Sequence, residues 1–116
     1  MQLTTYTLKT CDTCRKALKA LEAAGHDVTN IDIRADGVPP GALSGWMAAL
    51  GPEVLVNTRS TTWRGLSEAE RARAATAEGA AALLAEHPTL MKRPVIVAGE
   101  DVHVGWTPAV RGALGA

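Results

Sequence analysis

Residues 10–16 read Thr10-Cys11-Asp12-Thr13-Cys14-Arg15-Lys16. They hold both cysteines of the chain, two residues apart. Before them, residues 3–8 are rich in β-forming side chains and contain no breaker, which predicts a buried strand. After them, the apolar residues between positions 12 and 24 follow helical spacing, and Gly25 provides a stop signal. The cysteines therefore lie where a strand passes into a helix, and any sulfur chemistry of the protein starts there.

The segments on either side predict an α/β fold. Val28, Ile31 and Ile33 form a second short strand, and a strand that returns after a helix runs parallel to the first. Near the other end of the chain, residues 94–97 and 102–104 flank Gly-Glu-Asp, a pattern typical of a β-hairpin, and a last short helix follows at 107–114. The order is β-α-β, a helical stretch, then β-β-α.

Residues 40–88, roughly, form that helical stretch. A helix with Leu43 and Leu50 on one face ends at Gly-Pro, and no clear period follows up to residue 62. A capping box at 67–70 then starts an alanine-rich helix, with a break near Thr76 and an end before His87-Pro88.

Composition limits the class of protein. A chain of 116 residues fits one domain. Twelve basic and twelve acidic residues balance, so no overall field attracts nucleic acid. No apolar run approaches the ~18 residues of a membrane span, and the first residues lack the pattern of a signal peptide. We expect a cytoplasmic protein without a membrane partner, where a close cysteine pair is more often redox-active or metal-binding than structural.

Cys11 is the candidate nucleophile, because it stands at the start of a helix. Lowering a thiol pKa by about 1.5 units needs roughly 2 kcal/mol of preference for the thiolate. A helix N-terminus supplies typically ~0.3–1 kcal/mol. Nearby N–H donors or a cation must therefore supply the rest, and the candidate cations are Arg15, one turn on, and Arg59, Arg64 and Arg93 from other segments.

Cys14 lies on the apolar face of the same helix. From there it could attack a mixed disulfide on Cys11, a resolving role. Alternatively, it is a small buried hydrophobic residue and Cys11 an incidental thiol. A zinc site is not expected, since His26, His87 and His103 are scattered without metal-ligand spacing.

Two further stretches carry possible binding groups. Arg93-Pro94 precedes a strand, and Pro94 could be cis, turning the backbone toward Cys11, or an ordinary trans proline. Residues 57–64 combine two arginines with hydroxyl and amide donors, a set suited to a carboxylate or oxyanion. The alternative is a loop with solvated arginines and Trp63 in the core.

Several of these motifs together resemble those of the ArsC/Spx family, and most closely its YffB-like branch. The resemblance rests on Cys11-Asp12-Thr13-Cys14-Arg15-Lys16-Ala17, Asn57-Thr58-Arg59 with Thr61-Thr62-Trp63-Arg64, His87-Pro88, Lys92-Arg93-Pro94 and Val104-Gly105-Trp106. It implies one domain, residues 1–116, with a thioredoxin-like four-stranded mixed sheet and the helical insertion between its βαβ and ββα halves. It also favours a cis Pro94.

The resemblance implies a thiol-disulfide oxidoreductase, a glutathione-dependent thiol reductase with no tightly bound cofactor. Cys11 corresponds to the nucleophile and Arg93 to the group that stabilises its charge, while Cys14 or glutathione resolves the intermediate. Glutaredoxin or thioredoxin are further candidate electron donors.

Glutathione is expected to bind near the cysteine. Arg59 and Arg64 are candidates for holding one of its carboxylates. Asn57 and Trp63, together with Pro94, are expected to shape the pocket.

Two departures from the family pattern keep alternatives open. Arsenate reductases of the family place three arginines around the cysteine, whereas here Arg93 matches one, Arg59 falls near the second and Thr107 stands at the third. Cys14 in turn resembles the redox switch of Spx-type regulators that bind RNA polymerase, although no basic extension follows the last predicted helix. The regulator is the first alternative and arsenate reduction the second.

Overall fold

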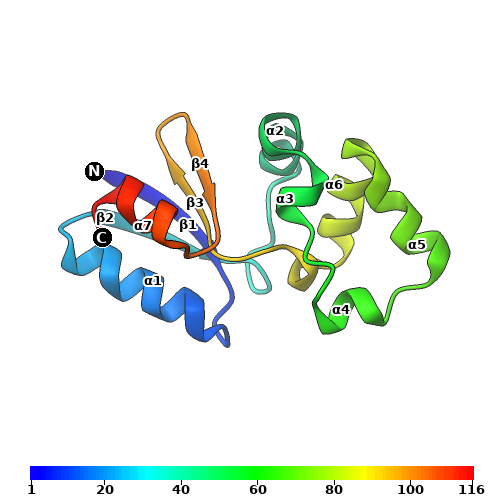
Figure 1. Ribbon diagram of the computed structural model, residues 1–116, viewed down its shortest axis with the longest axis horizontal. Helices are drawn as coiled ribbons and strands as arrows, with labels where there is room; N and C mark the ends of the chain where they lie inside the picture. The colour runs from blue at the N-terminus through cyan, green and yellow to red at the C-terminus, as the bar shows by residue number, and fades with distance from the viewer. The chain divides into compact units, whose positions relative to one another are not determined.

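The computed structural model describes residues 1–116, which divide into two compact units. One unit combines Met1–Asp36 with Arg93–Ala116, and the other is Gly37–Lys92. The chain leaves the first unit after its second strand and returns to it just before its third (Figure 1). The helical unit is thus an insertion, a few residues longer at each end than the predicted 40–88.

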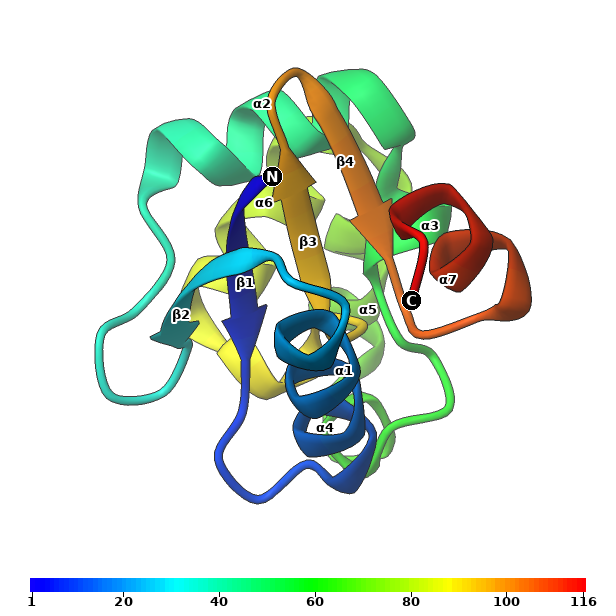
Figure 2. The ribbon, with the colours of Figure 1, turned by 90° about the vertical axis from the view of Figure 1, so that its left-hand side faces the viewer.

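The first unit is a four-stranded mixed sheet with two helices, as predicted (Figure 2). Its elements are β1 (Gln2–Thr7), α1 (Asp12–Ala23), β2 (Asp27–Asp32), β3 (Val95–Ala98), β4 (Asp101–Val104) and α7 (Pro108–Leu114). The strand order is β2-β1-β3-β4. β1 pairs with β2 in parallel and with β3 antiparallel, and β3 and β4 form the expected hairpin. The α/β class and the βαβ and ββα halves are therefore confirmed.

Helices α1 and α7 pack against one face of this sheet. Leu3 of β1 and Ile96 of β3 share a buried cluster with Leu21 of α1 and with Val110 and Leu114 of α7. Leu21 and Ile96 have no exposed surface at all. This packing anchors the first helix over the sheet and so fixes the position of the turn before it.

Helix α1 has the predicted beginning but ends one residue early. Its buried residues, Cys14, Ala17 and Leu21, keep the expected helical spacing. Ala24 was predicted to continue that face, but it lies beyond the last helical residue and is exposed. Gly25 follows with a φ of 90°, a conformation that favours glycine and ends the helix.

The helical unit is built from short helices. They are α2 (Pro40–Leu50), α3 (Pro52–Leu55), α4 (Thr61–Arg64), α5 (Glu68–Ala72), the 3₁₀ turn η1 (Arg73–Ala75), α6 (Ala77–Glu86) and the 3₁₀ turn η2 (Pro88–Leu90). α2 packs against α6, and both contribute to a core that includes Leu43, Trp46, Met47, Leu83 and Leu84.

The caps of this unit confirm the predicted boundaries. The Ser67 hydroxyl accepts from the Glu70 N–H while the Glu70 carboxylate accepts from the Ser67 N–H, which completes the capping box. The Thr76 hydroxyl caps α6 by accepting from the Gly79 N–H, so the predicted break is a real helix boundary. α6 ends at Glu86, before Pro88.

Two short helices lie where the sequence showed no clear period. α3 and α4 have four residues each, too few for an apolar period to emerge. Their start signals are visible in retrospect: Pro52 occupies the first turn of α3, and the Ser60 hydroxyl caps α4 by accepting from the Trp63 N–H.

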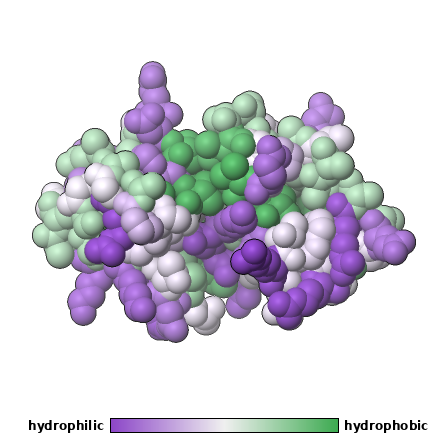
Figure 3. Space-filling model, in the orientation of Figure 1, coloured by the Kyte–Doolittle hydropathy of each residue, from purple (hydrophilic) through white to green (hydrophobic).

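None of the helices is both long enough and apolar enough to cross a membrane. In the space-filling view of the chain, hydrophobic colour gathers on the side of the β3–β4 hairpin of the first unit, whereas the hairpin's turn is hydrophilic (Figure 3).

Candidate active site

Cys11 is the residue that caps α1. Its backbone is extended, with φ −87° and ψ 113°, and its sulfur accepts from the backbone N–H of Cys14 at 3.4 Å. The Cys11 N–H donates to the Leu8 carbonyl at 2.9 Å, and the Cys11 carbonyl accepts from the Arg15 N–H at 3.1 Å. A sulfur therefore takes the place that a serine or aspartate oxygen usually fills at a helix start, where N–H groups point at a negative charge.

The pKa of the Cys11 thiol is lowered. Burial by itself raises it, but hydrogen bonds from the thiol and the N–H of Cys14, then the hydrogen bond and the charge of Arg93, outweigh burial. Arg93 is thus the cation that helps the helix N-terminus. Arg15, the other near candidate, is exposed and paired with Asp12 instead.

Cys14 has the opposite electrostatic environment. Its side chain is 1% exposed. Burial, followed by its hydrogen bond to Cys11 and the charge of that residue, raises the Cys14 pKa to about 12. Of the two thiols, Cys11 therefore loses its proton more readily, while Cys14 keeps its proton and donates it to a hydrogen bond.

The peptide bond between Arg93 and Pro94 is cis. The residues alone left both the cis and the trans form open, and the family resemblance favoured the cis form. The structure confirms the cis form. The Pro94 carbonyl accepts from the Gly105 N–H at 2.8 Å, next to the paired strands β3 and β4. Pro94 and Arg93 belong to the same unit as the two cysteines.

The loop before Cys11 is held by Asp32, a residue that the sequence did not single out. One of its carboxylate oxygens accepts from the Lys9 N–H at 3.0 Å, and the other accepts from the N–H groups of Arg34 and Ala35 at 2.9 and 3.0 Å. These three hydrogen bonds lower the pKa of the Asp32 carboxyl, and the one from the Ala35 N–H contributes most. The ends of the parallel strands are thereby tied together beside the cysteine motif.

A hollow of about 440 Å³ lies at the same edge of the sheet. Leu8 and Lys9 line it from the end of β1, Asp32 from the end of β2, and Cys14 and Leu18 from α1. Ligands of open α/β sheets bind beyond the carboxyl ends of parallel strands, so the parallel βαβ unit is the sequence signal that points to this place. Of the two cysteines, the hollow is lined by Cys14 and not by Cys11.

The other predicted binding residues, Asn57, Arg59, Arg64 and Trp63, lie in the helical unit. The Asn57 side chain accepts from the Arg59 N–H at 3.0 Å, and the Arg64 guanidinium donates to the Arg59 carbonyl at 3.2 Å. These contacts fold the turn that leads into α4. That Arg59 and Arg64 hold a carboxylate of glutathione, and that Asn57 and Trp63 shape its pocket, stays a prediction.

Arg71 of α5 contacts the end of α4. Its Nε donates to the Trp63 carbonyl at 3.1 Å and its Nη2 to the Arg64 carbonyl at 2.9 Å. Its guanidinium also lies over the Trp63 ring, 5.8 Å from the centroid. Arg71 thus satisfies the last carbonyls of α4, and Trp63 is half-buried beneath it.

Comparison with known proteins identifies the family. The profile of the ArsC family matches residues 6–113. The chain belongs to the ArsC family. An uncharacterised protein of Haemophilus influenzae is 41% identical over 106 residues, 90% of each chain. A solved structure of a YffB protein has a TM-score of 0.90 and 32% identity, covering 98% of this chain and 99% of its own.

A third relative is the solved structure of a protein related to arsenate reductase from Brucella melitensis. It has a TM-score of 0.75 and 34% identity, and the match covers 97% of this chain and 93% of that one. These ArsC relatives confirm the predicted family and the thioredoxin-like sheet. At the level of the family, they support a thiol oxidoreductase.

Thr107 bears on which ArsC chemistry is possible. Its hydroxyl accepts from the Val110 N–H at 3.2 Å and caps α7. The residue at the third expected arginine position therefore has a helix-capping role in this ArsC protein. Groups of three or more His, Cys, Asp or Glu side chains that could hold a metal ion are absent from the structure.

Proposed function

We propose that this protein is a thiol-disulfide oxidoreductase that uses glutathione as its reductant. The observation that carries the proposal is the division of charge between the cysteines: the Cys11 pKa is lowered beside Arg93, whereas the Cys14 pKa is raised to about 12. A thiolate is the nucleophile in thiol-disulfide exchange, so Cys11 is the attacking residue.

The reaction begins with a glutathione mixed disulfide of the substrate. The Cys11 thiolate attacks the glutathionyl sulfur, a bond forms between Cys11 and glutathione, and the substrate sulfur leaves as a thiolate that takes a proton from solvent. A second glutathione thiolate then attacks the glutathionyl sulfur on Cys11. Glutathione disulfide leaves and the Cys11 thiolate is restored, so one substrate disulfide is reduced for each glutathione disulfide made.

Arg93 stabilises the negative charge on Cys11 at the beginning and the end of this cycle. Because its hydrogen bond and its charge both lower the Cys11 pKa, it also makes Cys11 a better leaving group when glutathione attacks. The Cys14 N–H at the start of α1 also lowers the Cys11 pKa.

Cys14 assists in the resting enzyme as a hydrogen-bond donor to the Cys11 sulfur. Resolution by glutathione leaves Cys14 outside the covalent cycle. Resolution by Cys14 instead requires it to lose its proton and form a disulfide with Cys11, which two glutathione molecules then reduce. We favour the first route because a buried thiol with a pKa of about 12 supplies little thiolate at neutral pH.

A glutathione-coupled reductase assay on a small mixed disulfide tests the proposal. Cys11→Ser should abolish turnover, while Cys14→Ser should retain it at a reduced rate. Full activity in Cys11→Ser with loss in Cys14→Ser would reverse the assignment of nucleophile. If neither glutathione, glutaredoxin nor thioredoxin supports turnover of the unmodified protein, the oxidoreductase proposal fails.

The regulator alternative draws on the same pair of thiols, since two cysteines one helical turn apart can close a disulfide and act as a switch. A chain that shows no turnover but binds RNA polymerase only in one redox state would favour that alternative. Arsenate reduction is the weaker proposal because Thr107 offers no positive charge and its hydroxyl is used in the helix cap.

A further inference from the structure

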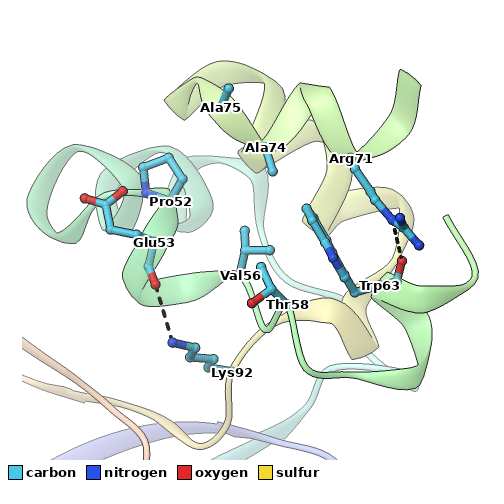
Figure 4. Close-up of a pocket in the computed structure, with 9 residues that line it drawn as sticks. All are labelled: Pro52, Glu53, Val56, Thr58, Trp63, Arg71, Ala74, Ala75 and Lys92. Atoms are coloured by element: carbon cyan, nitrogen blue, oxygen red, sulfur yellow. Dashed lines mark hydrogen bonds between the residues drawn. The ribbon is translucent and has the colours of Figure 1, made fainter. Parts of the chain in front are cut away.

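The helical unit contains a pocket of about 460 Å³ of its own (Figure 4). Pro52, Val56, Ala74 and Ala75 give it apolar walls, and Trp63 forms one side. This volume falls within the range of pockets that hold small organic molecules. Neither cysteine lines it, and Trp63 is the one lining residue that the sequence analysis placed near glutathione.

The Trp63 ring is a fixed wall of this pocket. It stands between Arg71 on one side and Val56 with Thr58 on the other (Figure 4). Arg71 clamps it by stacking at 5.8 Å and by donating to the Trp63 carbonyl. Since one ring face is covered by the guanidinium, the side toward Val56 is where a flat apolar group can stack.

Lys92 supplies a charge at the pocket. It is half-buried, and its ammonium makes only a long contact, 3.4 Å, to the backbone carbonyl of Glu53. It forms no ion pair with a carboxylate, and neither does Arg71. The Glu53 carboxylate, the one acidic group in the lining, points away from Trp63 (Figure 4). A partly desolvated cation without a counter-ion favours an anion.

We propose that this pocket binds a small carboxylic acid with a flat apolar body. The body stacks on Trp63 and contacts Val56 and Ala74, while the carboxylate accepts from the Lys92 ammonium and the Thr58 hydroxyl. Neither cysteine is among the groups that would contact the acid, so we infer binding without chemical change. This binding does not depend on the thiol chemistry of Cys11.

NMR titration with 3-phenylpropionate tests the proposal directly. The chain has three tryptophans, hence three indole N–H signals, and Trp63→Phe assigns the one that belongs to the pocket. We expect 3-phenylpropionate to shift the Trp63 signal and the amides of 52–58, with much smaller effects from the uncharged 3-phenylpropanamide. Equal affinity for acid and amide, or shifts confined to the other tryptophans, would overturn the proposal.

Three variants test whether 3-phenylpropionate binds in this pocket or non-specifically. Lys92→Gln should weaken 3-phenylpropionate about fivefold, as expected for losing one partly exposed ion pair, without changing the weak binding of the amide. Ala74→Leu should block both ligands by filling the apolar wall. Lys19→Gln removes the same charge from the exposed face of α1 and should leave the affinity unchanged.

The Cys11→Ser variant distinguishes this pocket from the redox site. It should bind 3-phenylpropionate with the same affinity as the unmodified protein, whatever the outcome of the reductase assay. Unchanged affinity in Ala74→Leu, or loss of binding in Cys11→Ser, would contradict the proposed site. All variants are first checked for the native chemical-shift pattern, so that a failure to fold is not counted as a failure to bind.

Discussion

The backbone N–H of Cys14 donates to the Cys11 sulfur at 3.4 Å, while the Cys14 side chain is 1% exposed. One residue thus provides both a backbone and a side-chain donor to its neighbour's sulfur. The second cysteine of the motif has a role before any disulfide forms, because its protonated thiol stabilises the thiolate of the first.

This relationship predicts a graded effect of substitutions at Cys14. Cys14→Ala keeps the backbone donor but loses the thiol donor, so the Cys11 pKa should rise. Cys14→Ser keeps a side-chain donor, and the rise should be smaller. Thiolate absorbance as a function of pH measures both. An unchanged Cys11 pKa in Cys14→Ala would mean that the thiol–thiol hydrogen bond contributes nothing.

Arg93 should matter more than the nearer Arg15. Arg93→Gln removes a hydrogen bond and a charge that lower the Cys11 pKa, so alkylation of Cys11 at neutral pH should slow about tenfold, the cost of one charge-assisted hydrogen bond. Arg93→Lys should recover part of the rate by restoring the charge. Arg15→Gln is the matched control, and its rate should equal that of the unmodified protein because Arg15 pairs with Asp12.

The two cysteines also predict opposite pH dependences of stability. Between its lowered pKa and the ordinary value of 9.0, Cys11 binds fewer protons in the folded than in the unfolded chain, so its contribution to stability grows as pH rises through that window. Cys14 contributes below pH 9.0, and its contribution is lost as pH rises toward about 12.

Urea unfolding of the unmodified protein and of Cys11→Ala measures how the contribution of Cys11 to stability depends on pH. The difference in their free energies of unfolding should increase from acidic pH up to about pH 9. A constant difference over that range would mean that the Cys11 pKa is the same in the folded and unfolded chains.

The sequence predicts most of the fold because its strongest signals are local. The strand-to-helix junction at Cys11, the capping box at Ser67 and the break at Thr76 each depend on residues within one turn. The residues alone left Arg93 as one of three distant candidates to help Cys11, and only the resemblance selected it, since 81 residues separate the two in the chain. The role of Asp32 was invisible for the same reason: its N–H partners include Lys9 on another segment.

Asp32 gives the last prediction. Its carboxylate ties the Lys9 N–H, just before the cysteine motif, to the turn formed by Arg34 and Ala35. Asp32→Ala removes both carboxylate oxygens and with them all three hydrogen bonds, so amide hydrogen exchange at these residues should accelerate and the urea midpoint should fall. Asp32→Asn keeps one carbonyl oxygen and should give an intermediate result.

The same carboxylate predicts a pH dependence. Because the Asp32 pKa is lowered, the contribution of Asp32 to stability should disappear as pH falls through that lowered value. Equal exchange rates in the unmodified protein and Asp32→Ala would show that the tie does not order this loop.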